Sequence, residues 1–337
     1  MRSVLNRHSD VCVSGETHYF DDLRARFADP MSGPLGAEDK KRCEDYFMAL
    51  THRPYGHGGE PGHGWLKRKA ILSGLTSDSP SPDEYFVTYC GVTAERAGAR
   101  IWGEKTPRHI FRLEDMLKRF PNAKVIAMVR DPRAVVASYR DWKNQGGFDL
   151  EKDPGHADAL EADQKRSRRS YNILVATMLW KSGVASALGA RDHYGADVVR
   201  LVNYEQLVLE PRNVLESIAE WLGVEFQEVM MDAPILNSSF HPFDDSGGFQ
   251  RNAVDHWKKR LSESEVSVIE RCAGSALIDS GYDQVGDGSI SLRYVWEIIK
   301  LPFAALRALI ANRERIANAP EYIWRRAQLL LRGASPR

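Results

Sequence analysis

A strand candidate at residues 124–129, apolar throughout after Lys124 and followed at once by a helix start, is the feature that most restricts the fold of this chain. The run shows no alternation between apolar and polar residues, which is typical of a strand buried on both faces of a parallel sheet. Asp131 and Pro132 come directly behind it. A capping carboxylate before a proline predicts the first turn of a helix. The segment therefore indicates a strand, a tight turn and a helix in immediate succession.

Short apolar segments and helical segments continue to alternate along the chain. Residues 11–13, 101–103 and 198–202 are apolar enough to predict further strands. We expect an α/β fold in which a parallel sheet is flanked by helices. Helices are expected at residues 1–6, 19–27, 39–50, 107–119, 165–193, 211–222 and 262–281, with another starting at Ser81.

The composition restricts the class of protein. The 337 residues carry 46 basic and 46 acidic side chains, so the zero net charge does not favour a nucleic-acid binder. None of the four cysteines lies in a Cys-x-x-Cys pair, which disfavours a disulfide framework or a metal site. The first residues lack the apolar core of a signal peptide, and no apolar run of about 18 residues predicts a spanning helix. We therefore expect a reducing, cytoplasmic compartment.

A segment rich in glycine and aspartate divides the chain near residues 284–289. Residues 1–283 are expected to form the α/β domain, and residues 284–337 a helical, basic, amphipathic tail. Apolar residues of the tail recur at helical spacing, with Pro302 expected to kink the helix. Two interpretations stay open: this stripe docks on the core, or it contacts a membrane surface with the cations beside it. The stripe is Leu292, Val295, Trp296, Ile299, Phe303, Leu306 and Ile310, and the cations are Arg293, Lys300, Arg307, Arg313 and Arg315.

Residues around the strand at 125–129 predict an anion site. Ligands of open α/β sheets bind beyond the carboxyl ends of the strands, where Arg130 stands. The helix that begins at Asp131 offers free N–H groups and its dipole to an anion, and Ser138 adds a hydroxyl about two turns further on. The alternative is an ordinary ion pair of Arg130 with Asp131 or Asp141, and the spacing alone does not decide between them.

Three segments in this region share a specific order and spacing. Residues 103–109 read G-E-K-T-P-R-H, residues 119–124 read R-F-P-N-A-K, and residues 129–138 read V-R-D-P-R-A-V-V-A-S. The series resembles the sulfotransferases that use 3′-phosphoadenosine 5′-phosphosulfate (PAPS) as donor. Arg130 and Ser138 match the family's arginine and serine that hold the 3′-phosphate of the donor. Lys105 matches the lysine that stabilises the leaving group.

The resemblance continues on both sides of these segments. Tyr204, in an N-Y-E-Q-L-V segment, matches a tyrosine that contacts the donor nucleotide in the family. Residues 237–240 and Arg251, followed by W-K-K-R-L-S, are similar to the segment that covers the 3′-phosphate. Near the start, a Gly-Glu-Thr sequence resembles protein-tyrosine and bacterial polysaccharide sulfotransferases, and its Glu16 matches their catalytic base.

The resemblance implies a fold of P-loop-kinase-like topology and a defined reaction. A sulfuryl group would pass from the co-substrate PAPS to a hydroxyl or amine, with a carbohydrate as the first acceptor and a peptide tyrosine as the second. No metal and no nucleic-acid partner is implied. Two alternatives remain: a non-catalytic nucleotide-binding or interaction protein, and a nucleotide-dependent phosphotransferase. The phosphotransferase is disfavoured because the sequence contains no G-x-x-x-x-G-K-[ST] motif.

One part of the family pattern would precede Met1. The family begins with an apolar strand and a P-R-S-G-T-T loop that wraps the 5′-phosphosulfate, and residues 1–6 resemble the helix behind that loop. No other glycine-rich loop of the chain replaces it. We expect the chain as written to be poorly soluble and inactive, with its 3′-phosphate half-site still recognisable.

Overall fold

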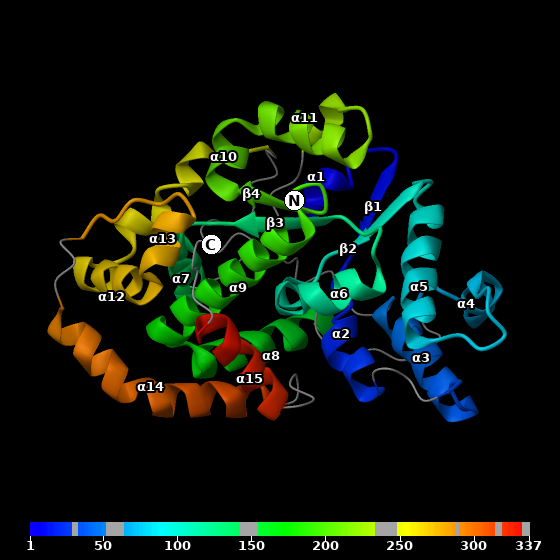
Figure 1. The fold of residues 1–337 in the computed structure, drawn as a ribbon, viewed down its shortest axis with the longest axis horizontal. Coiled ribbons are helices and arrows are strands. Elements are labelled where there is room, and N and C mark those ends of the chain that lie inside the picture. Colours follow the sequence, from blue (N-terminus) through cyan, green and yellow to red (C-terminus); the bar gives the residue numbers. More distant parts are fainter. Residues whose placement is uncertain are drawn as a thin grey trace. The chain divides into compact units, whose positions relative to one another are not determined.

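The computed structural model describes residues 1–28, 33–51, 64–141, 154–232, 248–286, 290–313 and 319–331. Contacts between residues divide the chain into two compact units. The described residues of unit 1 lie within 1–109 and 154–163, and those of unit 2 lie within 110–141, 164–313 and 319–331 (Figure 1). Each unit is described by itself.

Unit 1 contains one pair of parallel strands. β1 (Val11–Ser14) pairs with β2 (Ile101–Glu104), and the register sets Ser14 opposite Glu104. Helix α5 (Pro82–Arg96) contacts both strands and two further helices, with Ser81 accepting a hydrogen bond from the backbone of Glu84 as its cap. The other helices of this unit are α1 (Arg2–Leu5), α2 (Tyr19–Asp22), η1 (Arg24–Arg26), α3 (Ala37–Leu50) and α4 (Arg68–Gly74).

Unit 2 is built around a second parallel pair and one long helix. β3 (Val125–Val129) pairs with β4 (Val199–Asn203), and Val129 lies opposite Asn203. Helix α9 (Ile173–Tyr194) contacts β4 and the helices α7, α12, α14 and α15. It is long and apolar enough to span a membrane by length and composition, but these contacts make it the core helix of unit 2.

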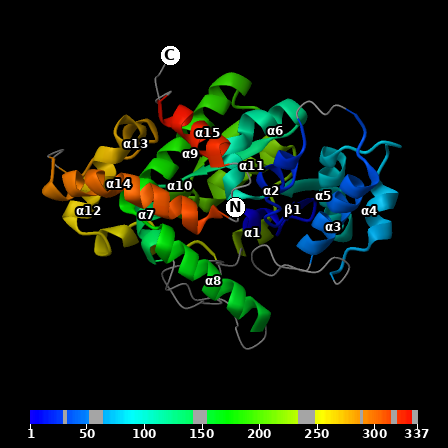
Figure 2. The same cartoon turned by 90° about the horizontal axis from the view of Figure 1, so that it is seen from below.

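The remaining elements of unit 2 surround α9 or continue the two strands. Figure 2 shows α14 and α15 of the tail beside α9. Two elements, η2 (Pro107–Arg112) and α8 (Pro154–Ser170), cross the division between the units. The others are α6 (Leu113–Arg119), α7 (Pro132–Asp141), α10 (Tyr204–Leu209), α11 (Pro211–Leu222), η4 (Glu228–Asp232), η5 (Arg251–Ala253), η6 (His256–Lys259), α12 (Glu263–Ala273), α13 (Ser275–Asp279), α14 (Leu292–Ala311) and α15 (Ala319–Leu331).

The structure confirms a mixed α/β fold with parallel strands at the predicted segments, and it corrects several helices. The helix expected at 165–193 is interrupted, because the side chain of Asn172 accepts hydrogen bonds from Leu174 N and Val175 N and so starts α9 anew. Gly274, at φ 59°, separates α12 from α13 where one helix was expected. The expected helices at 19–27 and 107–119 each contain a 3₁₀ segment, η1 and η2.

The strand expected to be buried on both faces is covered mainly on one. Ala127 is buried, and Val125 and Val129 pack against core clusters of unit 2. Met128, which faces the other side because side chains alternate along a strand, is 37% exposed. The prediction from the apolar run, burial on both faces, therefore overestimated the burial of this strand.

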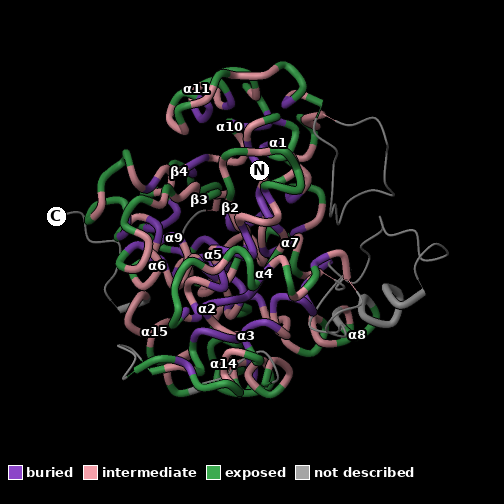
Figure 3. Tube along the Cα trace, turned by 90° about the vertical axis from the view of Figure 1, so that its right-hand side faces the viewer, coloured by how far each residue is buried: buried purple, intermediate pink, exposed green. Residues whose placement is uncertain are grey.

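The apolar stripe of the tail is also corrected. Figure 3 shows α14 in the colours of partly buried and exposed residues. It contacts α9 and α12, but through Tyr294, Leu301 and the buried Ala304. The predicted stripe lies on the opposite face of the helix and is exposed at each of its positions, so the stripe itself does not dock on the core. Arg315 lies outside the described residues.

Candidate functional site

Glu16 and Lys105 lie together at the carboxyl ends of the strands of unit 1. Glu16 follows β1 and Lys105 follows β2, and the parallel register brings the two strand ends side by side. The ammonium of Lys105 donates a hydrogen bond to Oε1 of Glu16. Both side chains are about 40% exposed (42% and 40%), so the pair remains open to solvent on one side. A carboxylate and a cation are thus available together at this edge.

A buried carboxylate fixes the loop that carries Glu16. Glu104, whose side chain is 5% exposed, accepts hydrogen bonds from the backbone N–H and the hydroxyl of Thr17, both at 2.8 Å. The hydroxyl of Thr106 donates to the same oxygen at 2.6 Å. Residues on both sides of the Glu16–Lys105 pair are therefore tied to one side chain.

The environment of Glu104 favours its ionised form. Burial by itself would raise its pKa, because a charge loses hydration in the interior. Nδ1 of His109 lies 3.0 Å from Oε2 of Glu104, and the threonine donors surround Oε1. These partners outweigh burial and hold the pKa of Glu104 below its ordinary value.

His18 completes this loop in an uncommon backbone conformation. Its φ of 53° lies in the left-handed region, which is disfavoured for residues with a Cβ. Its N–H donates to the hydroxyl of Thr106 at 3.1 Å, and its Nε2 lies 3.4 Å from Oε2 of Glu16. Glu16 is therefore flanked by Lys105 on one carboxylate oxygen and by His18 on the other.

A second group of predicted residues meets in unit 2. Arg130 follows β3 and Tyr204 follows β4, and the guanidinium carbon of Arg130 lies 4.2 Å from the centroid of the Tyr204 ring. Nη2 of Arg130 reaches the carbonyl of Ala253 at 3.5 Å, and the Trp180 indole donates to the carbonyl of Arg130 at 2.8 Å. The arginine is therefore held over an aromatic face, a contact that suits a planar cation.

The alternative prediction, an ion pair of Arg130 with Asp131 or Asp141, is wrong. Asp131 pairs with Arg133 at 2.8 Å, and Asp141 pairs with Arg140 and Arg260. Within the described part of the chain, no carboxylate pairs with Arg130, and its Nε is buried without a hydrogen-bond partner. A partly buried cation with an unused donor is what an anion site requires.

The start of helix α7 does not offer the donors that the sequence predicted. The N–H of Asp131 already donates to Glu205 at 3.1 Å, and the N–H of Arg133 donates to the carboxylate of Asp131 at 2.8 Å. Pro132 has no N–H. The expected anion site at this helix terminus is therefore occupied by the chain's own carboxylates, and Arg130 remains as the donor near it.

Two further predicted residues belong to unit 2. Ser138 is a half-buried residue of α7, about 9 Å along the helix axis from Pro132 at 1.5 Å per residue. Arg251 is exposed at the start of η5, and its Nη2 donates to the carbonyl of Leu209 at 2.9 Å. The same short turn contains Ala253, the acceptor of Arg130, so it belongs to this second group. Residues 237–240 lie outside the described part of the chain.

A network behind Arg130 was missed from the sequence. Arg133, 4% exposed, binds Asp131 and donates to Glu270 at 2.6 Å, and its guanidinium carbon lies 4.3 Å from the Trp257 ring. Glu205 accepts from the hydroxyl of Tyr282 at 2.7 Å. Only the V-R-D-P-R order pointed here, because the partners come from distant parts of the sequence.

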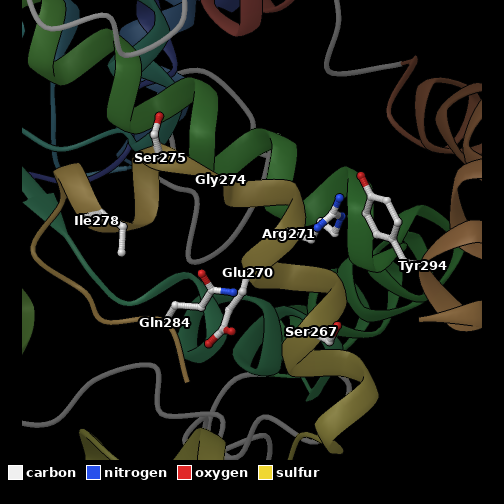
Figure 4. A pocket seen from close by; sticks show the side chains of 8 residues that line it. All are labelled: Ser267, Glu270, Arg271, Gly274, Ser275, Ile278, Gln284 and Tyr294. Atoms are coloured by element: carbon white, nitrogen blue, oxygen red, sulfur yellow. The ribbon is translucent and has the colours of Figure 1, made fainter. Parts of the chain in front are cut away.

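A pocket of about 500 Å³ lies beside α12 in the same unit (Figure 4). None of the predicted site residues lines it. One of its lining residues, Glu270, is bound to Arg133 of the network behind Arg130. The lining residues are Ser267, Glu270, Arg271, Gly274, Ser275, Ile278, Gln284 and Tyr294.

The structure thus gathers the predicted residues into two groups. Glu16 and Lys105 form one, and Arg130, Tyr204 and the turn of Arg251 form the other, each at the carboxyl ends of a parallel pair. A carboxylate, a neighbouring ammonium and an uncompensated arginine are the residue types that transfer of an anionic group uses.

Comparison with known proteins identifies the family. The model of the sulfotransferase family matches residues 1–228, and the chain belongs to this family. The nodulation protein NoeE of Sinorhizobium fredii (strain NBRC 101917 / NGR234) is 26% identical over 200 residues, which cover 56% of this chain. The matched region spans 46% of NoeE, so this chain corresponds to about half of that relative.

Two solved structures are similar to the chain over most of its length. The sulfotransferase domain from the curacin biosynthetic pathway is 18% identical, with a TM-score of 0.45, and the match covers 84% of this chain and 92% of that domain. The sulfotransferase domain from the Synechococcus PCC 7002 olefin synthase is also 18% identical, with a TM-score of 0.40 and coverage of 81% and 89%.

Proposed function

We propose that this protein transfers a sulfuryl group from PAPS to a hydroxyl or amine of an acceptor. Membership of the sulfotransferase family supports the reaction class. The observation that carries the donor assignment is Arg130, a cation held over the ring of Tyr204 without a carboxylate partner among the described residues. A site built in this way suits a phosphorylated nucleotide, because it offers both a charge and an aromatic face.

In this proposal, the residues around Arg130 bind the nucleotide part of the donor. Arg130 and Ser138 hold the 3′-phosphate, Tyr204 contacts the nucleotide, and Arg251 covers the phosphate from its turn. The buried, unused Nε of Arg130 fits this assignment, since an anion would satisfy it. The contact would be charge-assisted and worth roughly 1.5–3 kcal/mol.

Glu16 and Lys105 are assigned to the transfer itself. Bound PAPS would supply an activated sulfuryl group. The oxygen of the acceptor would attack its sulfur while the bond from sulfur to the 5′-phosphate oxygen breaks. Glu16 takes the proton of the acceptor hydroxyl as general base. Lys105 neutralises the charge that develops on the departing phosphate. The products are the sulfated acceptor, adenosine 3′,5′-bisphosphate and the proton on Glu16.

The ion pair between Lys105 and Glu16 has a consequence for this role. Lys105 donates a hydrogen bond to Glu16 and orients it until donor phosphate competes for the ammonium. His18, at the other carboxylate oxygen, keeps Glu16 in place when Lys105 turns towards the donor. Donor binding would thus leave the carboxylate available to the acceptor.

Two finer assignments belong to the proposal. The topology is P-loop-kinase-like, which the two parallel pairs and the family membership support. The acceptor is a carbohydrate, with a peptide tyrosine as the second candidate. Neither the geometry of the Glu16 edge nor the relatives' names single out one acceptor, so a panel of both kinds is the appropriate test.

The decisive experiment follows transfer from radiolabelled PAPS to glycans and tyrosine peptides, beside calorimetry with adenosine 3′,5′-bisphosphate. Transfer to a member of the panel that Glu16→Gln abolishes is the result that supports the proposal, and it would overturn the sequence-based expectation that the chain as written is inactive. Nucleotide binding without transfer to any acceptor would favour the non-catalytic alternative. If the protein does not bind the nucleotide at all, the donor assignment is wrong.

A further inference from the structure

The outward face of helix α14 is a continuous apolar surface. Residues at positions 292, 295, 296, 299, 303, 306 and 310 recur every three or four residues and therefore share one side of the helix. All of them are exposed, among them Leu292 at 90%, Phe303 at 78% and Trp296 at 55%. Exposed apolar patches of this kind mark interaction surfaces.

The inward face of the same helix already has its partners. Tyr294 and Leu301 pack against the core cluster formed by α7, α9 and α12, and Ala304 is buried. The cap of the helix is formed as well, since Ser291 accepts a hydrogen bond from the backbone of Tyr294. The outward stripe is therefore not needed to hold α14 on unit 2.

Charge distinguishes the stripe from an ordinary apolar patch. Glu297 is the only acidic residue in the sequence of α14. Its side chain is 14% exposed and accepts a hydrogen bond from Asn172 of α9, so it belongs to the inward side. Four cations of α14 and its end are exposed. Lys300 lies 3.9 Å from Glu297, Arg293 pairs with Glu265 of α12, and Arg307 donates to the carbonyl of Tyr171. α14 and its end therefore set four cations against one carboxylate of their own. These cations are Arg293, Lys300, Arg307 and Arg313.

We propose that α14 binds the surface of a lipid bilayer that contains anionic lipids. The helix lies in the plane of the headgroups, with Trp296, Phe303 and their neighbours inserted towards the acyl chains. The flanking cations meet the lipid phosphates, as in amphipathic helices that bind membranes through one apolar face with Lys and Arg beside it. Lys300 suits this position, because its ammonium lies 4.6 Å from the centroid of the Trp296 ring.

The alternative occupant, a second copy of this chain, fits less well. A two-fold interface through α14 would bring the same cations of both copies together. Glu297, the one carboxylate in the sequence of α14, lies 3.9 Å from Lys300 and also accepts a hydrogen bond from Asn172, so it cannot compensate the cations of both copies. An anionic surface has the complementary charge, so the same feature that opposes self-association favours lipid binding.

The test is flotation of the full chain with vesicles of phosphatidylcholine, with and without phosphatidylglycerol. Binding is expected to depend on phosphatidylglycerol and to weaken as salt is raised. Trp296→Ser with Phe303→Ser should lower the partition coefficient about tenfold to a hundredfold, because two large apolar side chains no longer leave water. The matched control, Leu72→Ser with Ile278→Ser, removes exposed apolar residues (49% and 56% exposed) elsewhere and should bind as the wild type.

A charge series tests the electrostatic half. Lys300→Glu with Arg313→Glu should weaken binding to the anionic vesicles about tenfold or more. Lys41→Glu with Lys118→Glu makes the same change of net charge at two other exposed lysines (69% and 64%) and should have little effect. Circular dichroism verifies that each variant is folded.

Three results would overturn the inference. The first is absence of flotation by the folded wild type with phosphatidylglycerol vesicles. The second is equal flotation of the wild type and the Trp296, Phe303 variant. The third is a dimer in light scattering that this variant converts into a monomer, which would assign the stripe to a second copy. Because these readouts do not involve sulfuryl transfer, failure here leaves the proposed function standing.

Discussion

The guanidinium carbon of Arg130 lies 4.2 Å from the centroid of the Tyr204 ring, although 73 residues lie between the two in the sequence. Each residue directly follows its strand, and the pairing of Val129 with Asn203 places them side by side. The sheet, rather than a flexible loop, therefore sets this contact. A cation and a ring prearranged in this way lose little freedom when a nucleotide binds.

Arg130→Ala is expected to weaken binding of adenosine 3′,5′-bisphosphate about tenfold to a hundredfold, since a charge-assisted contact of roughly 1.5–3 kcal/mol is lost. Isothermal titration calorimetry measures the change. Arg212→Ala, which removes an exposed arginine bound to Glu216 and Glu228, serves as the control. An Arg130→Ala protein with wild-type affinity would remove Arg130 from the site.

Tyr204→Leu should reduce nucleotide affinity by about threefold to thirtyfold. The leucine keeps an apolar side chain but loses the aromatic face that orients Arg130, a contact worth about 0.5–2 kcal/mol. The same calorimetric titration applies. Tyr204→Phe retains the ring and should bind nearly as the wild type, so equal losses in both variants would point to the hydroxyl instead.

Glu16→Gln should slow sulfuryl transfer about 10²- to 10⁴-fold, because the amide keeps the size of the side chain but cannot accept the acceptor's proton. Nucleotide binding should be unchanged, which separates the loss of a base from the loss of the donor site. Glu38→Gln, at a 90% exposed position of unit 1, provides the control. Transfer within a few-fold of the wild type would exclude Glu16 as the base.

Glu104→Gln should lower the free energy of unfolding at neutral pH by about 1–3 kcal/mol, because donors that face a carboxylate lose a charged acceptor. The pKa of Glu104 is lowered in the folded protein, so its contribution is fully present above the unfolded pKa of about 4.3 and is lost as pH falls through the lower folded value. Denaturant titrations near neutral pH and below about pH 4 should therefore show the difference between variant and wild type shrinking in acid. A constant difference across this window would contradict the assignment.

Glu270→Gln should destabilise unit 2 by about 3–5 kcal/mol, since removal of one partner leaves the buried charge of Arg133 partly uncompensated. Both side chains are nearly inaccessible, at 1% and 4% exposed. Thermal and denaturant unfolding report the change. The control Glu228→Gln breaks an exposed ion pair with Arg212 and should leave the unfolding midpoint unchanged. Equal losses of stability in the two variants would contradict a dependence of the ion-pair contribution on burial.

Local signals in the sequence were sufficient for the elements that depend on them. The capping box of Ser262 and Glu265 starts α12 as expected. The short apolar runs place β3, which ends at Val129, and β1, which extends one residue beyond the predicted 11–13 to Ser14. Family motifs then selected the residues that the structure gathers at these strand ends. Their roles in binding and transfer remain predictions.

Other features depend on contacts between distant segments and could not be predicted. Glu104 meets Thr17 across 87 residues, and Arg133 meets Glu270 across 137, so no local pattern marks either partner. The orientation of α14 also depends on contacts with a distant segment. Its sequence contains apolar residues on both sides, and only packing on α9 decides that Tyr294 and Leu301 face inward.

At His18, the backbone conformation favours a residue other than the one that contacts Glu16, so conformational stability and catalytic activity are expected to favour different residues. Among the non-glycine residues that the structure describes, His18 is the one with a positive φ, a conformation that glycine adopts without steric strain. A library screened for heat tolerance should therefore enrich glycine or asparagine at this position, whereas a library screened for product should retain the imidazole beside Glu16. The two selections would diverge at this position, and their divergence would measure how much stability the chain gives up to hold that carboxylate.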